Sequence, residues 1–206
     1  MLLLFYRFTR HTMKNFLSLI LLIGSIFLLG CTKPVPVDIE TSTWTNTTPT
    51  NIPEENIPKR QSYENKIDGF SLQFPGDRTF QEKVYGASVV FSSPITETDK
   101  IKENVMIVKS PLDKPYTLEE YYLILKDEAA KQPNYVEIES SIIKINDLDA
   151  KKIIYKSTSN STKLQFQQVL FIKNDFVYTF TYTATEATFA EYAQKINEMI
   201  ATLEIK

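Results

Sequence analysis

Cysteine, histidine and glycine are scarce in this sequence. The 206 residues include one cysteine, Cys31, one histidine, His11, and five glycines. A single cysteine excludes a disulfide within the chain. Five glycines, none in a phosphate-binding pattern, exclude a glycine-rich nucleotide loop. His11 precedes the cleavage site argued below, so the mature chain would lack histidine. Histidine-based nucleophiles and histidine-ligated zinc are then excluded. We therefore predict no catalytic residue, no metal site and no cofactor.

The sequence also lacks an excess of positive charge. It has 23 Lys and Arg against 25 Asp and Glu, a formal net charge of −2. The first 30 residues carry Arg7, Arg10 and Lys14 and no acid, so the remainder is more acidic than the average suggests. Nucleic-acid-binding proteins need a basic face to neutralise phosphates. The charge balance predicts that no nucleic acid binds.

The N-terminal region contains an apolar run over residues 16–29. The run is short for a membrane-spanning helix, which needs about 20 residues. It fits the apolar segment of a secretory signal peptide, typically about 7–15 residues behind a basic start. Lys14 supplies that basic start, and Met13 is an alternative initiation site to Met1. We predict that residues 1–30 are a signal peptide.

The apolar run ends Leu28-Leu29-Gly30-Cys31. This ending resembles the lipobox of bacterial lipoproteins, with a small residue directly before the cysteine. Gly30 fits a peptidase that cleaves between Gly30 and Cys31, and the Cys31 thiol accepts the diacylglycerol. Two acyl chains anchor a protein stably, where one is marginal. The alternative is an uncleaved signal anchor. The lipobox predicts a protein held extracytoplasmically, on the periplasmic or outer face of a membrane, by lipid on Cys31.

Residues 32–62 are rich in threonine, proline and asparagine and have no sustained period of 2 or 3.6. Such a composition buries too little apolar surface to offset the chain entropy lost on folding. As a flexible coil this length spans about 30 Å. We therefore interpret residues 31–62 as the lipidated cysteine followed by a disordered tether, and residues 63–206 as one domain.

The domain shows strand and helix patterns in a fixed order. Thr117 with Glu120 predicts a capping box at the start of a helix, and Asn174-Asp175 predicts a hairpin turn. Strands are predicted over 70–74, 79–85, 87–91, 104–110, 136–145, 150–157, 163–173 and 176–184, and helices over 118–132 and 186–203. Hairpin connections imply antiparallel pairing. We expect an α+β fold, an antiparallel β-sheet with helices packed on both faces (an α/β/α sandwich), and the last hairpin near the sheet centre.

Several residue runs carry a family resemblance over residues 63–206. They are Asp68-Gly69-Phe70-Ser71-Leu72-Gln73-Phe74-Pro75, Val89-Val90-Phe91 with Ser92-Ser93-Pro94, Asn104-Val105, Thr117-Leu118-Glu119-Glu120-Tyr121, and the terminal hairpin with its helix. The domain resembles the PsbP-like family, whose fold is shared with Mog1 and with envelope proteins of the DcrB type. Phe80 stands where photosystem members commonly have tryptophan, and the mature chain offers no histidine for the metal sites of that family.

The resemblance implies an extrinsic, non-catalytic subunit or assembly aid for an envelope or membrane complex, with a protein partner of unknown identity. A role at photosystem II follows only by family analogy. Two alternatives stay open. An envelope hydrolase would need two carboxylates about 5–9 Å apart, and a small-ligand carrier would need a sizeable apolar pocket between helix and sheet.

Tyrosine is abundant, with 11 in the chain. Tyr116, Tyr121, Tyr122 and Tyr135 cluster in sequence around the first helix of the domain. Tyrosine is enriched at protein interfaces, and it also fills ordinary α+β cores. The sequence leaves both interpretations open, and these four residues are the candidate interaction surface.

Overall fold

The structure, a computed structural model, describes residues 60–94 and 101–206. Its elements are β1 (Arg60–Asn65), β2 (Phe70–Pro75), β3 (Thr79–Glu82), β4 (Val89–Ser92), β5 (Asn104–Pro111), α2 (Leu118–Ala129), β6 (Val136–Ile145), β7 (Leu148–Ser159), β8 (Thr162–Lys173), β9 (Phe176–Thr185), α3 (Phe189–Ala201) and β10 (Glu204–Ile205). The predicted signal peptide, the lipobox and the tether up to residue 59 lie outside the described residues.

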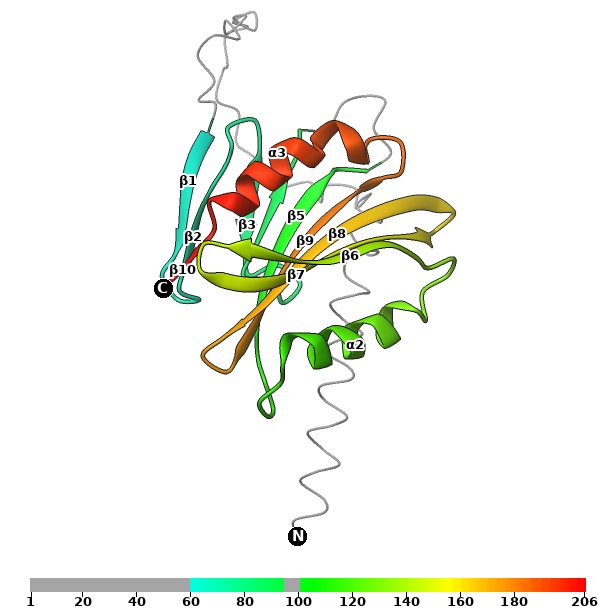
Figure 1. Cartoon of the computed structure of the whole chain (residues 1–206). Coiled ribbons are helices and arrows are strands. Elements are labelled where there is room, and N and C mark those ends of the chain that lie inside the picture. The colour runs from blue at the N-terminus through cyan, green and yellow to red at the C-terminus, as the bar shows by residue number, and fades with distance from the viewer. Residues whose placement is uncertain (1–59, 95–100) are drawn as a thin grey trace, which may run out of the picture.

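The strands form two antiparallel sheets. The larger sheet has the order β3-β4-β5-β9-β8-β7-β6, and the smaller has the order β1-β2-β10. Helix α3 packs against β2 and β9, whereas α2 packs against β7 and β8. Figure 1 shows the two helices on opposite sides of the large sheet. The predicted α+β class, the antiparallel pairing and the helices on both faces are confirmed.

The large sheet separates two apolar cores because its strands alternate. On β8, Val169 and Phe171 belong to the core under α3, whereas Phe166 and Leu170 belong to the core under α2. Side chains at successive positions of a strand point to opposite faces. The hairpin of β8 and β9 is therefore covered on both faces, as its doubly apolar sequence predicts. Asn174 and Asp175 turn this hairpin with φ values of 50° and 61°.

Four aromatic rings join the small sheet to the edge of the large one. Phe91 lies 5.4 Å from Tyr63, 4.9 Å from Phe74 and 6.0 Å from Phe80, measured between ring centroids. Phe91 is fully buried, but Phe80 on edge strand β3 is 46% exposed. These tilted and edge-to-face contacts are the arrangements that aromatic pairs prefer. The rings hold the two sheets together at this corner.

Several predicted boundaries were wrong. Strand β1 begins at Arg60, so the segment assigned to the tether ends three residues too late. Strand β3 ends earlier than predicted and strand β4 begins later. The cause is the connection between them, in which Lys83, Tyr85 and Gly86 adopt positive φ. Strand β10 was not predicted, since two residues carry no readable period. Helix α3 begins at Phe189, three residues later than the sequence suggests.

Candidate functional site

Helix α2 sets the position of the predicted tyrosines. The capping box is confirmed: the Thr117 hydroxyl accepts from the Glu120 backbone N–H, and the Glu120 carboxylate accepts from the Thr117 N–H. This pairing fixes where the first turn begins and hence which side chains face the sheet. Tyr121, Tyr122, Leu125 and Ala129 face inward and are buried. Leu123 points away from the sheet and is 52% exposed.

The four candidate tyrosines do gather around α2, but two of them are core residues. Tyr121 and Tyr122 are each 4% exposed. The rings of Tyr116 and Tyr121 meet edge-to-face at 5.8 Å, and Tyr135 packs at 5.4 Å against Tyr155 of β7. Burial raises the pKa of Tyr121 to about 12. Of the four, Tyr116 and Tyr135 are partly exposed. An interaction surface made of all four tyrosines stays a prediction, and the burial of Tyr121 and Tyr122 disfavours it.

The hydroxyls of two of these tyrosines, Tyr122 and Tyr135, converge on one carboxylate, Glu137 of β6. Tyr122 Oη donates to Glu137 at 2.9 Å, Tyr135 Oη at 3.2 Å, and Lys126 Nζ at 3.2 Å. Burial alone would raise the pKa of Glu137, but the hydrogen bonds from Tyr122 and Lys126 outweigh it and hold the pKa below its usual value. The carboxylate therefore stays charged and locks α2 to β6.

A second ion pair fixes the start of α2. Lys151 Nζ of β7 lies 3.0 Å from Glu119, and it also lies 4.1 Å from the centroid of the Tyr122 ring. The lysine side chain is only 9% exposed. An ammonium over a tyrosine face is attracted by the ring quadrupole, more strongly when it is desolvated. Tyr122 thus stabilises the helix position through both its hydroxyl and its ring.

Around these locked contacts lies an exposed apolar surface. Three large aliphatic side chains on α2 and β6 are more than half exposed, and we call them the α2–β6 face: Leu123 52%, Ile138 51% and Ile142 56%. Val136 is 56% exposed as well, but it lies opposite Lys156 whereas Ile142 lies opposite Lys151, so Val136 leaves the other side of the sheet. Single exposed apolar residues are ordinary, but several on two adjoining elements make a candidate interaction site. These residues could not be predicted from the sequence, because nothing local shows that β6 is the outermost described strand of the large sheet.

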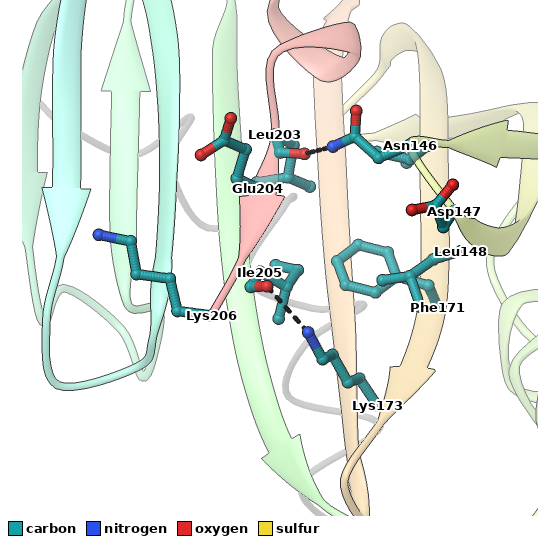
Figure 2. A pocket seen from close by; sticks show the side chains of 10 residues that line it. Asn146, Asp147, Leu148, Phe171, Lys173, Leu203, Glu204, Ile205 and Lys206 are labelled. Carbon is teal, nitrogen blue, oxygen red and sulfur yellow. Dashed lines mark hydrogen bonds between the residues drawn. The ribbon is translucent and has the colours of Figure 1, made fainter.

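A crevice of about 330 Å³ opens between β10 and the β6–β7 turn. Figure 2 shows Phe171 and Leu148 along one side, with Asn146 and Lys173 reaching toward the β10 backbone. Asn146 Nδ2 donates to the Leu203 carbonyl at 2.8 Å, and Lys173 Nζ donates to the Ile205 carbonyl at 2.8 Å. If the protein carried a small ligand in this crevice, the ligand would have to enter between these two hydrogen bonds. The two hydrogen bonds hold the β10 segment beside the large sheet.

Glu103 and Glu137 do not make the carboxylate pair that a hydrolase requires, because they lie on opposite sides of the large sheet. Glu103, 2% exposed, accepts hydroxyl hydrogen bonds from Ser93 and from Thr188 beside α3, both at 2.8 Å. Glu137 lies on the α2 side of the sheet. Within residues 60–94 and 101–206 no three Asp, Glu, Cys or His side chains come together as a metal site.

No helix among the described residues is long and apolar enough to cross a membrane. Cys31 and Gly30 lie outside those residues, so their predicted lipidation and cleavage stay predictions.

Solved structures of similar fold include the following three bacterial proteins. The cyanobacterial PsbP (CyanoP) of Synechocystis sp. PCC 6803 has a TM-score of 0.54 at 13% identity, over 72% of this chain and 93% of that one. LpqN of Mycobacterium tuberculosis, described as involved in cell envelope biogenesis, has a TM-score of 0.58 at 11% identity, over 71% and 90%. PA94 of Pseudomonas aeruginosa, of unknown function and described as a putative regulator, has a TM-score of 0.54 at 16% identity, over 72% and 99%. At such identities the likeness shows the fold.

No curated protein matches the sequence. A family model does, that of the PsbP-like proteins, and it matches residues 18–203, most of the chain. The fold built above, two helices on opposite faces of an antiparallel sheet, agrees with that match. The chain belongs to the PsbP-like protein family.

Proposed function

We propose that this protein is a lipid-anchored, extracytoplasmic PsbP-like domain that serves an envelope or membrane complex as a non-catalytic accessory or assembly module. The lipobox ending at Gly30 and Cys31 supports the anchor. Family membership supports the accessory role, and the fold relative LpqN is described as involved in cell envelope biogenesis. A domain on a tether of about 30 Å reaches partners near the headgroups.

The observation that carries the proposal is the α2–β6 face. Its three exposed aliphatic side chains lie on two elements that are held together by the Glu137 hydrogen bonds and the Lys151–Glu119 pair. A rigid frame lowers the entropy lost when a partner binds. Lys126, Glu139 and Lys144 belong to the same two elements and would supply the polar rim that protein interfaces have. We infer that a protein partner contacts this face.

The anchor is tested by the substitution Cys31→Ser in cells of a lipoprotein-processing bacterium. We expect the precursor to stay uncleaved at Gly30 and to incorporate no labelled fatty acid, because the hydroxyl cannot take the place of the thiol in acylation. Immunoblotting for precursor size and metabolic palmitate labelling measure both effects. Wild-type amounts of label in the variant would contradict the lipid anchor.

The partner-binding face is tested by placing a photo-crosslinking amino acid at Leu123. The matched control is Ile67, which is 77% exposed and lies in the β1–β2 turn, outside the α2–β6 face. In the native membrane we expect discrete crosslinked bands from position 123 that position 67 does not give. Mass spectrometry then identifies the protein in each band. The same bands from both positions, or none from position 123, would contradict the proposed face.

A further inference from the structure

Apolar side chains line most of the crevice between β10 and the β6–β7 turn. Ile145 and Leu148 come from the turn side, Phe171 from β8, and Leu203 and Ile205 from the C-terminal segment. The crevice volume of about 330 Å³ lies at the lower end of the range of small-molecule sites, about 300–1,000 Å³. An apolar group of a small ligand would leave water on entering the crevice, which favours binding.

Lys173 is the charged side chain that reaches across this crevice. Its Nζ donates to the Ile205 carbonyl, a neutral acceptor, at 2.8 Å. Among residues 60–94 and 101–206, no ion pair with an aspartate or glutamate includes Lys173. An ammonium has three donor hydrogens, and the bond to the carbonyl uses one of them. The positive charge of Lys173 is therefore able to accept an anion from outside the domain.

The other charged residues around the crevice do not neutralise Lys173. Figure 2 shows the charged groups of Glu204 and Lys206 turned away from Phe171, and Lys206 forms an ion pair with Glu64. Asp147 lies in the β6–β7 turn, at the other end of the crevice from Lys173, and is exposed to solvent. The Lys173 end of the crevice therefore favours a negative charge.

The backbone of Ile205 offers a second donor beside the ammonium. Lys206 N–H donates to the Gly69 carbonyl at 2.8 Å, in line with the ladder between β10 and β2. In an antiparallel pair, alternate residues of a strand turn their N–H and C=O groups toward the neighbour, so those of Ile205 point away from β2. The bond from Lys173 to the Ile205 carbonyl lies on that side. The Ile205 N–H therefore points to the same side of β10 as the ammonium.

We propose that this crevice binds a small carboxylic acid with an unbranched apolar chain, of the fatty-acid class. The carboxylate accepts from Lys173 Nζ and from the Ile205 N–H, and the chain packs on Phe171 and Leu148. Charge-assisted hydrogen bonds are stronger than neutral ones, so the site selects a carboxylate over an alcohol of the same length. A primary amine is disfavoured beside the Lys173 ammonium. The inference goes beyond the proposed accessory role and does not require the lipid anchor.

The ligand class is tested by isothermal titration calorimetry of the full-length chain in phosphatidylcholine nanodiscs. The probes are octanoate, octanol and octylamine, and empty nanodiscs give the blank for partitioning into lipid. We expect saturable binding of octanoate, binding of octanol that is at least about tenfold weaker, and still weaker binding of octylamine. The proposal is overturned if octanol or octylamine binds as tightly as octanoate, or if octanoate gives no saturable signal above the blank.

The position of the site is tested with three variants. Lys173→Met keeps the aliphatic stem and removes the ammonium, so octanoate should bind about tenfold more weakly while octanol is unaffected. Asp147→Asn is the matched control at the other end of the crevice, with no expected weakening. Leu148→Trp keeps Lys173 and fills the crevice from β7, so octanoate binding should be lost even if K173M releases β10 and fails to fold. Wild-type octanoate affinity in L148W, or equal weakening in D147N and K173M, would overturn the proposal.

Discussion

Replacing Phe91 with alanine is expected to lower the free energy of unfolding by about 3–5 kcal/mol, the cost of a buried phenylalanine truncation. Phe91 is fully buried between the two sheets, in ring contact with Tyr63, Phe74 and Phe80. Its removal loses the transfer free energy of the ring and leaves a cavity that three rigid aromatic neighbours cannot fill. Because domains are stable by only about 5–15 kcal/mol, the loss is a large fraction of the total.

Phe80→Ala is the matched control for this loss. Phe80 belongs to the same aromatic cluster but is 46% exposed on an edge strand. Its truncation removes less buried area and opens onto solvent, so we expect a cost of about 1.5 kcal/mol. Urea denaturation followed by far-ultraviolet circular dichroism measures both variants. Equal losses would show that the corner between the sheets does not depend on Phe91 as described.

The second large effect is expected at Glu103. Glu103→Ala should lower the free energy of unfolding by about 3 kcal/mol, because two hydrogen bonds to a charged acceptor are lost and the hydroxyls of Ser93 and Thr188 lose their partner. Arg78 adds to the cost. It is 5% exposed, burial lowers its pKa, and the nearby negative charge of Glu103 favours its charged form. Without Glu103 the buried guanidinium is less well compensated.

Glu103→Gln separates the charge from the shape of the side chain. The amide keeps one acceptor oxygen, so we expect a loss of stability smaller than that of Glu103→Ala. Glu191→Ala, an exposed residue in the first turn of α3, should cost only a few tenths of a kcal/mol. Thermal unfolding at one pH compares the three variants. A loss in Glu103→Ala no larger than in Glu191→Ala would contradict the role given to the buried carboxylate.

The long elements were predictable from the sequence because their signals are local. Each of these signals involves residues that are close together in the chain. Examples are the capping box of Thr117 and Glu120, the apolar stripe of α3 and the Asn174-Asp175 turn. Strand β1 was not predictable, since Arg60-Gln61-Ser62 is polar and buries only Tyr63 and Asn65. Strand β1 forms because it pairs with β2, and the position of β2 depends on the whole fold. Tertiary pairing of this kind outweighs local preference.

The candidate site was predicted only in part for the same reason. Tyrosines spaced along a helix could face a core or a partner, and burial of Tyr121 and Tyr122 follows from which face of α2 meets the sheet. The convergence of hydroxyls on Glu137 needs a strand some 15 residues away. Exposure of Ile138 and Ile142 depends on β6 being the outermost strand. None of these facts is encoded in a short window.

The small sheet places β1 and β10 on either side of β2. Figure 1 shows β2 beside β1, with β10 at the C-terminus next to it. Ile205 is aligned with Phe70, and Lys206 N–H donates to the Gly69 carbonyl at 2.8 Å. Closure of this sheet therefore requires contacts between residues from opposite ends of the domain, and contacts so distant in sequence form slowly. Until β10 pairs, one edge of β2 keeps unpaired backbone groups that another strand could bind.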